Sequence, residues 1–264
     1  QGVANLLSDI VRFFPSPEYR ECVGINRKTN EIFEAHHDFA AAKTAYVFKT
    51  MVDPFIGKYS FVKVCSGLLK GDDVLYNPES DAEAKIGKIY TLSGNKPVEV
   101  QELFAGDIGA IAKLTSTKTG DTLSTKNTPV SYGRTEYSKP YTYMKYVVNN
   151  KGDEDKVSQA LAKMMAEDVT LKVVNDSENR QSLIYGMGDQ HLEVTASKLA
   201  ERYKVGIRLE TPKVAFRETI RKNSDVDTKY KKQSGGHGQY GHVKMRFEPS
   251  GDLETPYVFE EEVV

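Results

Sequence analysis

The chain of 264 residues contains 39% hydrophobic and 28% charged residues, a composition that excludes a disordered or collagen-like protein and fits two domains with part of a third. No run approaches the roughly 18 consecutive apolar residues of a membrane-spanning helix, and the first residues lack the basic start and apolar core of a signal peptide. The 36 basic and 37 acidic residues nearly balance, but they are unevenly distributed along the chain.

The first predicted element is an amphipathic helix. Apolar residues recur at helical spacing from Val3 to Phe14, and Pro15 and Pro17 end the pattern. A lone helix of this kind must bury its apolar stripe against another surface. Because no partner helix follows nearby, a domain that is missing from this chain is one candidate for that surface. Residues 22–39 show little periodicity and are predicted to be a linker.

Residues 42–130 predict an all-β domain. Short apolar or alternating runs are separated by turn residues such as Lys70-Gly71-Asp72 and Ala105-Gly106-Asp107. Regularly spaced short strands with such turns are typical of an antiparallel barrel or sandwich. The predicted strands are Thr44–Val52, Ser60–Cys65, Asp73–Tyr76, Lys85–Leu92 and Ile108–Leu114.

Residues 140–211 change to the order strand, helix, strand, strand, helix, strand. The segments from Val157 to Met165 and from Leu192 to Tyr203 carry helical apolar stripes, and Asp153 and Asp155 are candidates for the first N-cap. This order is the split βαβ, or ferredoxin-like, arrangement. The predicted strands are Tyr141–Val148, Leu171–Val174, Ser182–Tyr185 and Val205–Leu209.

The segment after Pro212 separates its charges. Residues 213–246 hold nine basic and three acidic residues, a net charge of +6, whereas residues 247–264 hold six acidic residues and no basic one. A local basic patch attracts phosphate backbones even when the whole chain is neutral, and a solvated surface is the other interpretation. His242–Phe247 alternates like a strand, and the segment is predicted to open a further domain.

Residues 236–241 match the pattern G-x-G-x-x-G. A dinucleotide-binding fold requires a hydrophobic strand before these glycines and a helix after them. Here Lys229 to Gln233 are basic and polar, and the following residues alternate like a strand, so this interpretation is rejected. Val243 completes the kinase pattern G-x-G-x-x-G-x-V, but the other kinase motifs do not follow.

The glycine-rich segment nevertheless predicts a binding surface. Its glycines let backbone amides approach a ligand closely, and its neighbours supply charge, hydrogen bonds and a stacking ring on a predicted flexible loop between two strands. That combination suits RNA backbone and exposed bases, with a solvated glycine-rich turn as the open alternative. The candidate RNA-facing residues are Lys231, Lys232, Ser234, Gly235, Gly236, His237, Gly238, Gln239, Tyr240, Gly241 and His242.

The other reactive side chains predict no site. Cys22 and Cys65 have neither the number nor the spacing of a zinc site, and two free thiols in a reducing cytoplasm are expected. His36-His37 is a lone pair, His191 is expected to be structural, and Asp121 is expected to be a turn residue. No catalytic, cofactor-binding or metal-binding residue is assigned.

Several blocks, taken in order, resemble elongation factor G, the translocation GTPase of bacterial ribosomes. The similarity extends over nearly the whole chain, from the last helix of the GTP-binding domain to a tip loop of the fourth domain. The order of so many blocks makes the resemblance specific. The blocks are Leu6–Pro17, Asp53–Gly57, Ser66-Gly67, Thr119–Leu123, Ser158–Leu161 with Glu167-Asp168, Gly186–Glu193, Pro212–Ile220 and Lys231–Val243.

The resemblance implies a multidomain α+β fold. It consists of an antiparallel β-barrel of the translation-factor type, a ferredoxin-like split βαβ domain and the start of a further α+β domain. The implied partners are the ribosome, with its RNA and proteins, tRNA and mRNA; the parent protein is expected to be cytoplasmic and monomeric, without a membrane contact. The implied boundaries are 1–39 for the last helix of a missing GTP-binding domain plus linker, 40–130 for the barrel, 137–211 for the ferredoxin-like domain and 212–264 for a truncated fourth domain.

The resemblance does not extend to catalysis in this chain. There is no G-x-x-x-x-G-K-[ST] loop, and Asn95-Lys96-Pro97-Val98 lacks the Asp of a guanine-reading motif. No enzyme activity and no cofactor are therefore expected here, while GTP and Mg²⁺ are expected in the missing domain of a GTP-hydrolysing parent. Lys63, Val169 and His237 depart from the usual family residues and indicate a divergent member. A tetracycline-resistance type ribosomal protection protein and a stand-alone RNA-binding module remain as alternatives.

Overall fold

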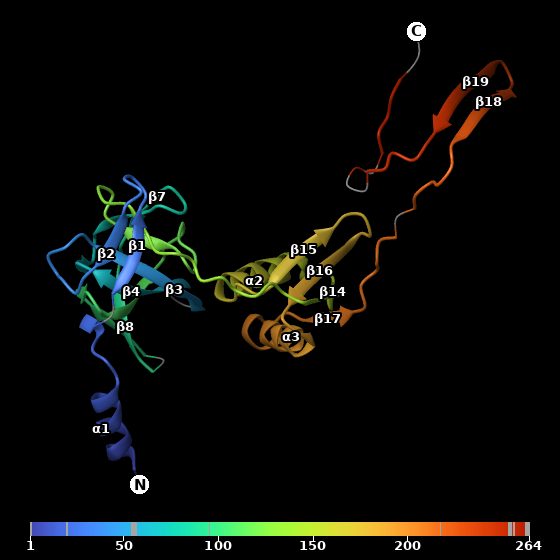
Figure 1. Cartoon of the computed structure of the whole chain (residues 1–264). Coiled ribbons are helices and arrows are strands. Elements are labelled where there is room, and N and C mark those ends of the chain that lie inside the picture. Colours follow the sequence, from blue (N-terminus) through green and yellow to red (C-terminus); the bar gives the residue numbers. More distant parts are fainter. Residues whose placement is uncertain are drawn as a thin grey trace. The chain divides into compact units, whose positions relative to one another are not determined.

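The computed structural model describes residues 2–19, 21–53, 57–94, 96–216, 218–252, 255 and 257–261. Its strands pair antiparallel and its helices are few, in the predicted multidomain α+β architecture (Figure 1). The chain divides into two compact units, Gln1–Lys213 and Val214–Val264. Some residues used above lie outside the described part of the chain: Pro54 to Ile56 of one block, Asn95, and Arg217.

Helix α1 (Val3–Phe13) confirms the predicted amphipathic helix. It ends where Phe14 takes an extended conformation ahead of Pro15, and a short 3-10 turn, η1 (Pro17–Tyr19), follows. The apolar stripe is exposed, with Leu6 at 59% and Leu7 at 58%. No residue of α1 is buried by the part of the chain that the structure describes.

The predicted linker at residues 22–39 is wrong for most of its length. β1 (Cys22–Asn26) and β2 (Ile32–Ala35) form a hairpin, and β1 also pairs with β13 (Val130–Ser131). Gly24 permits this close pairing, because a Cβ there would lie 2.9 Å from the Ser131 backbone oxygen. A strand whose partner lies so far along the chain leaves little local signal in the sequence.

The predicted all-β domain is an eight-stranded antiparallel sheet with a separate strand pair, β10-β5. Its strand order is β7-β6-β12-β3-β4-β11-β8-β9. The predicted strand Lys85–Leu92 is divided at residues 86–88, where buried Ile86 exchanges backbone hydrogen bonds with Asp72 and Asp73. The strands are β3 (Thr44–Asp53), β4 (Gly57–Ser66), β5 (Leu68–Lys70), β6 (Val74–Asn77), β7 (Ala82–Lys85), β8 (Ile89–Ser93), β9 (Lys96–Val100), β10 (Glu102–Phe104), β11 (Ile108–Ala112) and β12 (Thr122–Ser124).

The main apolar core of the barrel domain receives a side chain from most of its strands, and two smaller apolar clusters lie beside it. Val47 and Val62 come from β3 and β4, Ile111 from β11 and Leu123 from β12, and all four are fully buried. Burial of such side chains is worth about 1.5–3 kcal/mol each. The alternation of apolar and polar residues that predicted these strands is therefore the same alternation that builds the core.

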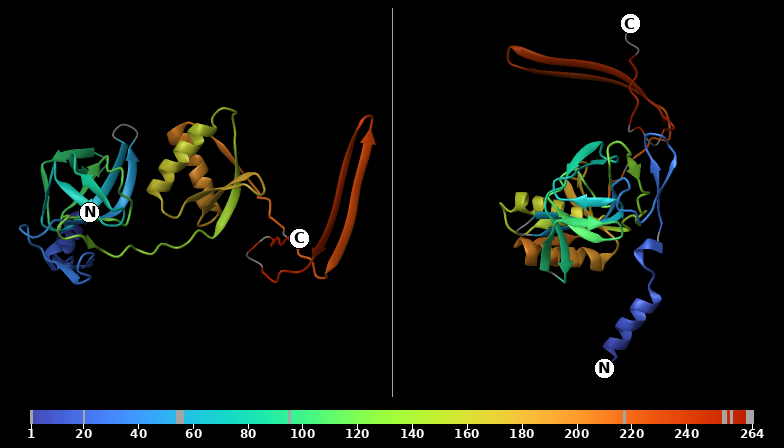
Figure 2. Two further views of the ribbon diagram at one scale, coloured as in Figure 1. Left: turned by 90° about the horizontal axis from the view of Figure 1, so that it is seen from above. Right: turned by 90° about the vertical axis from the view of Figure 1, so that its left-hand side faces the viewer.

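The predicted split βαβ domain is confirmed. Its sheet has the order β15-β16-β14-β17, and both helices pack on one face of it (Figure 2, left). Asp153 takes the N-cap position of the first helix, and Glu154 and Asp155 in the first turn suit the positive end of the helix dipole. The elements are β14 (Thr142–Val148), α2 (Glu154–Glu167), β15 (Lys172–Asp176), β16 (Gln181–Gly186), α3 (Asp189–Tyr203) and β17 (Ile207–Glu210).

An ion pair of the split βαβ domain binds the backbone of the barrel domain. Arg202 in α3 donates to both carboxylate oxygens of Glu167 in α2, at 2.8 and 3.1 Å. Glu167 Oε1 accepts the Val52 N–H at 2.7 Å, and Arg202 Nη2 donates to the Val52 carbonyl at 3.0 Å. One Arg–Glu pair therefore satisfies both backbone groups of Val52, close to the end of β3.

The second unit contains an antiparallel hairpin of two long strands. β19 (His237–Phe247) confirms the predicted strand at its carboxyl end and extends it toward the glycines. β18 (Ser224–Ser234) occupies a polar stretch for which no strand is predicted, so the sequence interpretation is wrong there.

Candidate nucleic-acid interface

The candidate RNA-facing residues lie on this hairpin and not on a flexible loop. The two strands pair from Ser224 opposite Phe247 to Ser234 opposite His237 (Figure 1). Only Gly235 and Gly236 form the turn, and Gly235 has a φ of 71°. A two-residue hairpin turn with positive φ at its first position favours glycine there. The loop prediction is thus corrected to a rigidly registered ribbon with a short tip.

The register sorts the side chains onto two faces, because residues opposite each other in an antiparallel pair share a face. The pairing defines two faces, which are called here the charged face and the apolar face. The charged face carries Asp225, Asp227, Lys229, Lys231, Tyr240, His242, Lys244 and Arg246. The apolar face carries Val226, Tyr230, Val243, Met245 and Phe247, followed toward the tip by Lys232 and Gln239.

Charges on the charged face are only partly compensated. His242 Nε2 lies 2.5 Å from Asp227 Oδ1, and Lys244 Nζ lies 3.4 Å from Asp227 Oδ2. The hydrogen bond with His242 is the main cause that lowers the pKa of Asp227. Lys231 and Lys232, nearer the turn, form no ion pair with any residue that the structure describes. These two cations are therefore available to a phosphate group.

Apart from the turn at Gly235, no described residue of the chain lies so close to these hairpin glycines that only glycine would fit. A Cβ added at Gly236 or Gly241 would meet no atom within 4 Å, and at Gly238 the nearest atom lies at 3.9 Å. Glycine inside a strand weakens it and often marks a place where a ligand or another backbone approaches closely. Gly236 belongs to the turn, but Gly238 and Gly241 lie inside β19 and therefore agree with a binding surface near the end of the hairpin.

The hairpin brings the predicted residues together in pairs. Lys231 lies opposite Tyr240, and Lys232 lies opposite Gln239. The Tyr240 ring is 68% exposed, which leaves it free for base stacking. Lys229 on the charged face is absent from the sequence prediction. The alternation of Val226, Thr228 and Tyr230 with charged residues was the signal that could have revealed this strand.

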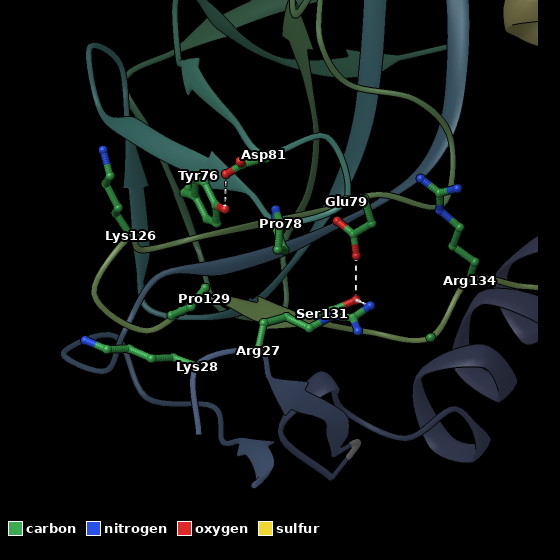
Figure 3. A pocket seen from close by; sticks show the side chains of 11 residues that line it. Arg27, Lys28, Tyr76, Pro78, Glu79, Asp81, Lys126, Pro129, Ser131 and Arg134 are labelled. Carbon is green, nitrogen blue, oxygen red and sulfur yellow. Dashed lines mark hydrogen bonds between the residues drawn. The ribbon is translucent and has the colours of Figure 1, made fainter. Parts of the chain in front are cut away.

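A second candidate site is a pocket of about 960 Å³ in the barrel domain (Figure 3). Ser131 Oγ donates to Glu79 Oε1 at 2.5 Å and accepts from Arg27 Nη2 at 3.3 Å. Glu79 Oε2 in turn accepts the Thr122 N–H at 3.0 Å. The central carboxylate of the pocket is therefore already occupied by hydrogen bonds within the chain.

Two of the four cations that line this pocket, Lys126 and Arg134, are paired with carboxylates. Lys126 Nζ lies 2.6 Å from Glu83, and Arg134 Nη2 lies 2.5 Å from Asp121. The other two cations, Arg27 and Lys28, share the pocket with the carboxylates of Glu79 and Asp81, so the pocket has weaker attraction for an anion than the hairpin tip. We assign no ligand to it.

His191 is held in one orientation by two hydrogen bonds. Its Nδ1 accepts the Met187 N–H at 3.1 Å, so Nε2 carries the proton and donates to Asp168 Oδ2 at 2.9 Å. Asp168 Oδ1 accepts from the Thr170 hydroxyl at 2.6 Å and from the Thr170 N–H at 2.9 Å. Both ring nitrogens of His191 are thus engaged, as the predicted structural role requires.

We expect acid to weaken the split βαβ domain through Asp168. Burial alone would raise the pKa of its carboxyl group, but hydrogen bonds from Thr170 and the contact with His191 outweigh burial and lower it. A lowered folded-state pKa stabilises the domain above the unfolded-state value of about 3.9, and this stabilisation is lost as the pH falls through the folded-state pKa. Asp168→Asn should therefore destabilise the domain by about 0.5 kcal/mol at neutral pH, a small value because the carboxylate is 42% exposed.

Urea unfolding followed by helical circular dichroism measures this difference, since α2 and α3 supply most of the helix. The gap between wild type and Asp168→Asn should close as the pH is lowered from about 4 to about 2. A gap that stays constant over this range would contradict the role given to Asp168.

The remaining reactive groups give no further site. Among the described residues, no cluster of three or more His, Cys, Asp or Glu side chains is arranged to hold a metal ion. Cys22 and Cys65 share one apolar cluster and form no disulfide, and a hydrogen bond with Cys22 and then burial raise the pKa of Cys65. Within the same described part of the chain, every helix is too short or too polar to cross a membrane.

Comparison with known proteins identifies three consecutive domains of one family. The family description "Elongation factor G domain 2" matches residues 42–126, "Elongation Factor G, domain III" matches residues 138–211, and "Elongation factor G, domain IV" matches residues 212–264. A crystal structure of a protein from Thermus thermophilus is 31% identical, with a TM-score of 0.72 over 93% of this chain. The chain spans 34% of the length of that protein.

Proposed function

Since this chain belongs to the elongation factor G family, we propose that it supplies the ribosome-contacting domains of a GTP-hydrolysing factor that moves tRNA and mRNA through the ribosome. In this proposal a preceding GTP-binding domain performs the hydrolysis. The barrel and split βαβ domains relay its nucleotide state, and the hairpin contacts RNA. The factor acts as a monomer in the cytoplasm.

The hairpin is the observation that carries the proposal. At one end of a registered ribbon it places two lysines that form no ion pair with a described residue, an exposed tyrosine and two strand glycines, Gly238 and Gly241. An added Cβ at either glycine would meet no described atom closer than 3.9 Å. Lysines neutralise phosphates, tyrosine stacks on bases, and glycines permit close approach of a backbone. These groups together suit RNA better than a small nucleotide, because no helix N-terminus follows the glycines among the described residues.

The contact between Val52 and the Glu167–Arg202 pair supports the relay. Hydrogen bonds to backbone groups transmit a displacement independently of the side chain at position 52. A conformational change of the factor would then move the barrel and split βαβ domains as bodies, with this contact as one of the points at which they meet.

Ribosome-stimulated GTP hydrolysis tests the function as a whole. A protein in which a GTP-binding domain precedes this chain should hydrolyse GTP faster when ribosomes are added. It should also shift mRNA by one codon in a translocation assay. Unchanged hydrolysis on ribosomes would contradict the proposal, and stimulated hydrolysis without translocation would assign the chain to another class of ribosomal GTPase.

The hairpin contact is tested by the salt dependence of RNA binding. Lys231→Ala removes one cation that we expect to neutralise one phosphate. The slope of log K against log salt concentration should therefore fall by about 1 for ribosomal RNA. Lys151→Ala, in an exposed turn of the split βαβ domain, is the matched control and should leave the slope unchanged. Equal slopes for wild type and Lys231→Ala would contradict the RNA contact and favour the alternative, a solvated surface.

A further inference from the structure

The four-stranded sheet of the split βαβ domain has a second face that the helices do not cover. Met144, Tyr146 and Val148 of β14 and Ile184 of β16 pack into the core beneath α2 and α3. Because side chains alternate along a strand, the residues between them point to the opposite side. This open face carries Tyr143 and Lys145 on β14, Leu183 and Tyr185 on β16, and Lys172 and Arg208 on the outer strands.

Two tyrosines lie side by side in the middle of this face. Tyr143 and Tyr185 are direct cross-strand partners on the two central strands, β14 and β16. Their ring centroids are 5.0 Å apart with an interplanar angle of 24°, which is a stacked arrangement. Tyr143 is 38% exposed. The pair therefore offers an aromatic surface that another flat ring can extend.

Cations surround the tyrosine pair. Lys172 on β15 is the direct partner of Tyr185, is exposed, and forms no ion pair with any described residue. Lys145 and Arg208 share a single carboxylate, Glu210, at 2.8 and 2.7 Å. Arg208 lies opposite Val147, four residues along β14 from Tyr143, so it belongs to the other end of the face. Lys172 and Lys145 therefore face one carboxylate near the tyrosines, and the local charge is complementary to phosphate.

The other end of the open face is closed by the chain itself. Gln181 accepts the Lys213 N–H at 2.9 Å and donates to the Lys213 carbonyl at 2.8 Å. Gln181 also donates to Asp176 at 2.9 Å, so the second carboxylate of the face lies at this closed end. The segment that leaves β17 therefore covers the end of the face that holds Gln181 and leaves Tyr143 accessible.

We propose that Tyr143, Tyr185 and Lys172, called here the tyrosine platform, bind unpaired bases of single-stranded RNA. A base stacks on a tyrosine ring, and Lys172 contacts the adjoining phosphate. Aromatic side chains on the central strands of a four-stranded βαββαβ sheet are a physically suitable base platform, because the flat sheet holds the rings at fixed positions. A protein partner would instead be favoured by a broad apolar surface, which the cations around the tyrosines interrupt. This inference goes beyond the hairpin and does not depend on it.

Fluorescence anisotropy with a labelled single-stranded oligouridine tests the platform in the full chain. Lys231→Ala combined with Tyr240→Ala serves as the background, so that the remaining binding reports on the sheet. Tyr143→Leu and Tyr185→Leu should each weaken this remaining binding about fivefold or more. Tyr143→Phe keeps the ring and should bind within about twofold of the background. Tyr137→Leu, an exposed tyrosine outside the sheet, is the matched control.

Photocrosslinking keeps the test decisive if a leucine variant unfolds. An oligonucleotide with 4-thiouridine should crosslink to wild-type peptides that contain Tyr143 or Tyr185. Unchanged affinity in folded leucine variants would overturn the proposal. Crosslinks confined to other peptides would also overturn it, as would binding of a ribosomal protein, and not of RNA, to the tyrosine platform. If RNA binding by the hairpin is absent while the tyrosine platform still binds RNA, only the hairpin proposal is contradicted. The two proposals can therefore be tested separately.

Discussion

Replacing Gly67 with alanine should destabilise the barrel domain by about 3 kcal/mol. Gly67 has a φ of 77°, a conformation that costs about 1–2 kcal/mol for a residue with a side chain. Its Cβ would also lie 2.8 Å from Lys43 Cα and 2.9 Å from the Ala41 carbonyl oxygen. Because both are backbone atoms, no rotamer change relieves the overlap, which adds about 1–3 kcal/mol.

The surrounding backbone cannot easily shift to make room. The Gly67 N–H donates to the Asp38 carbonyl at 2.9 Å, and the Gly67 carbonyl accepts the Ala105 N–H at 3.1 Å. Gly94→Ala is the matched control, since Gly94 has a φ of 63° but an added Cβ there would have no atom within 4 Å. Urea unfolding should give a loss of about 1 kcal/mol for the control. Equal losses for both variants would show that the close contacts at Gly67 are relieved.

Replacing Asp121 with alanine should also cost the barrel domain about 3 kcal/mol. The carboxylate is 1% exposed and accepts from Asn77 Nδ2 at 2.9 Å, from the Lys118 N–H at 2.8 Å and from Arg134 at 2.5 Å. Alanine would leave the Lys118 N–H without this acceptor, and the buried Asn77 amide would keep only the longer hydrogen bond to the Ser116 carbonyl, at 3.3 Å. Each unsatisfied buried group costs about 1–3 kcal/mol.

The control for Asp121 is an ion pair with similar geometry at the surface. Glu83 lies 2.6 Å from Lys126, but the two side chains are 58% and 69% exposed. Glu83→Ala should leave the free energy of unfolding nearly unchanged, because water and salt screen an exposed ion pair. Asp121→Asn should fall between the two, because it keeps the shape and one acceptor but loses the charge that faces Arg134. If Asp121→Ala and Glu83→Ala have equal effects on urea unfolding, burial is not the reason for the contribution of Asp121 to stability.

The architecture was predictable because its elements have strong periodicity. The stripes in α1, α2 and α3 and the alternation in β3, β4 and β14 indicate which side of each element is buried. Elements defined by distant partners were not predictable in this way. β1 and β2 depend on β13 for their sheet, and the division of the segment at Ile86 depends on hydrogen bonds from Asp72 and Asp73.

In the candidate site, the residue types were predictable from the sequence, but their pairing across the two strands was not. The glycines and lysines of the hairpin tip were identifiable from composition, but β18 was missed because its polar residues obscure the alternation. Without β18, the opposition of Lys231 to Tyr240 and the contact of Asp227 with His242 could not be derived. Asp121 is the clearest example of what the sequence does not predict. Its neighbours in the sequence indicate a turn residue, but its carboxylate is also a buried acceptor for Asn77 and Arg134.

The register of the hairpin restricts how its length can vary. Side chains alternate between the charged face and the apolar face, so one residue inserted into β18 would exchange the faces of every position between the insertion and the turn. Lys229 and Lys231 would then lie on the apolar face, opposite Gly241 and Gln239, and Tyr230 would move to the charged face. Insertions and deletions therefore preserve the two surfaces only when each strand gains or loses an even number of residues.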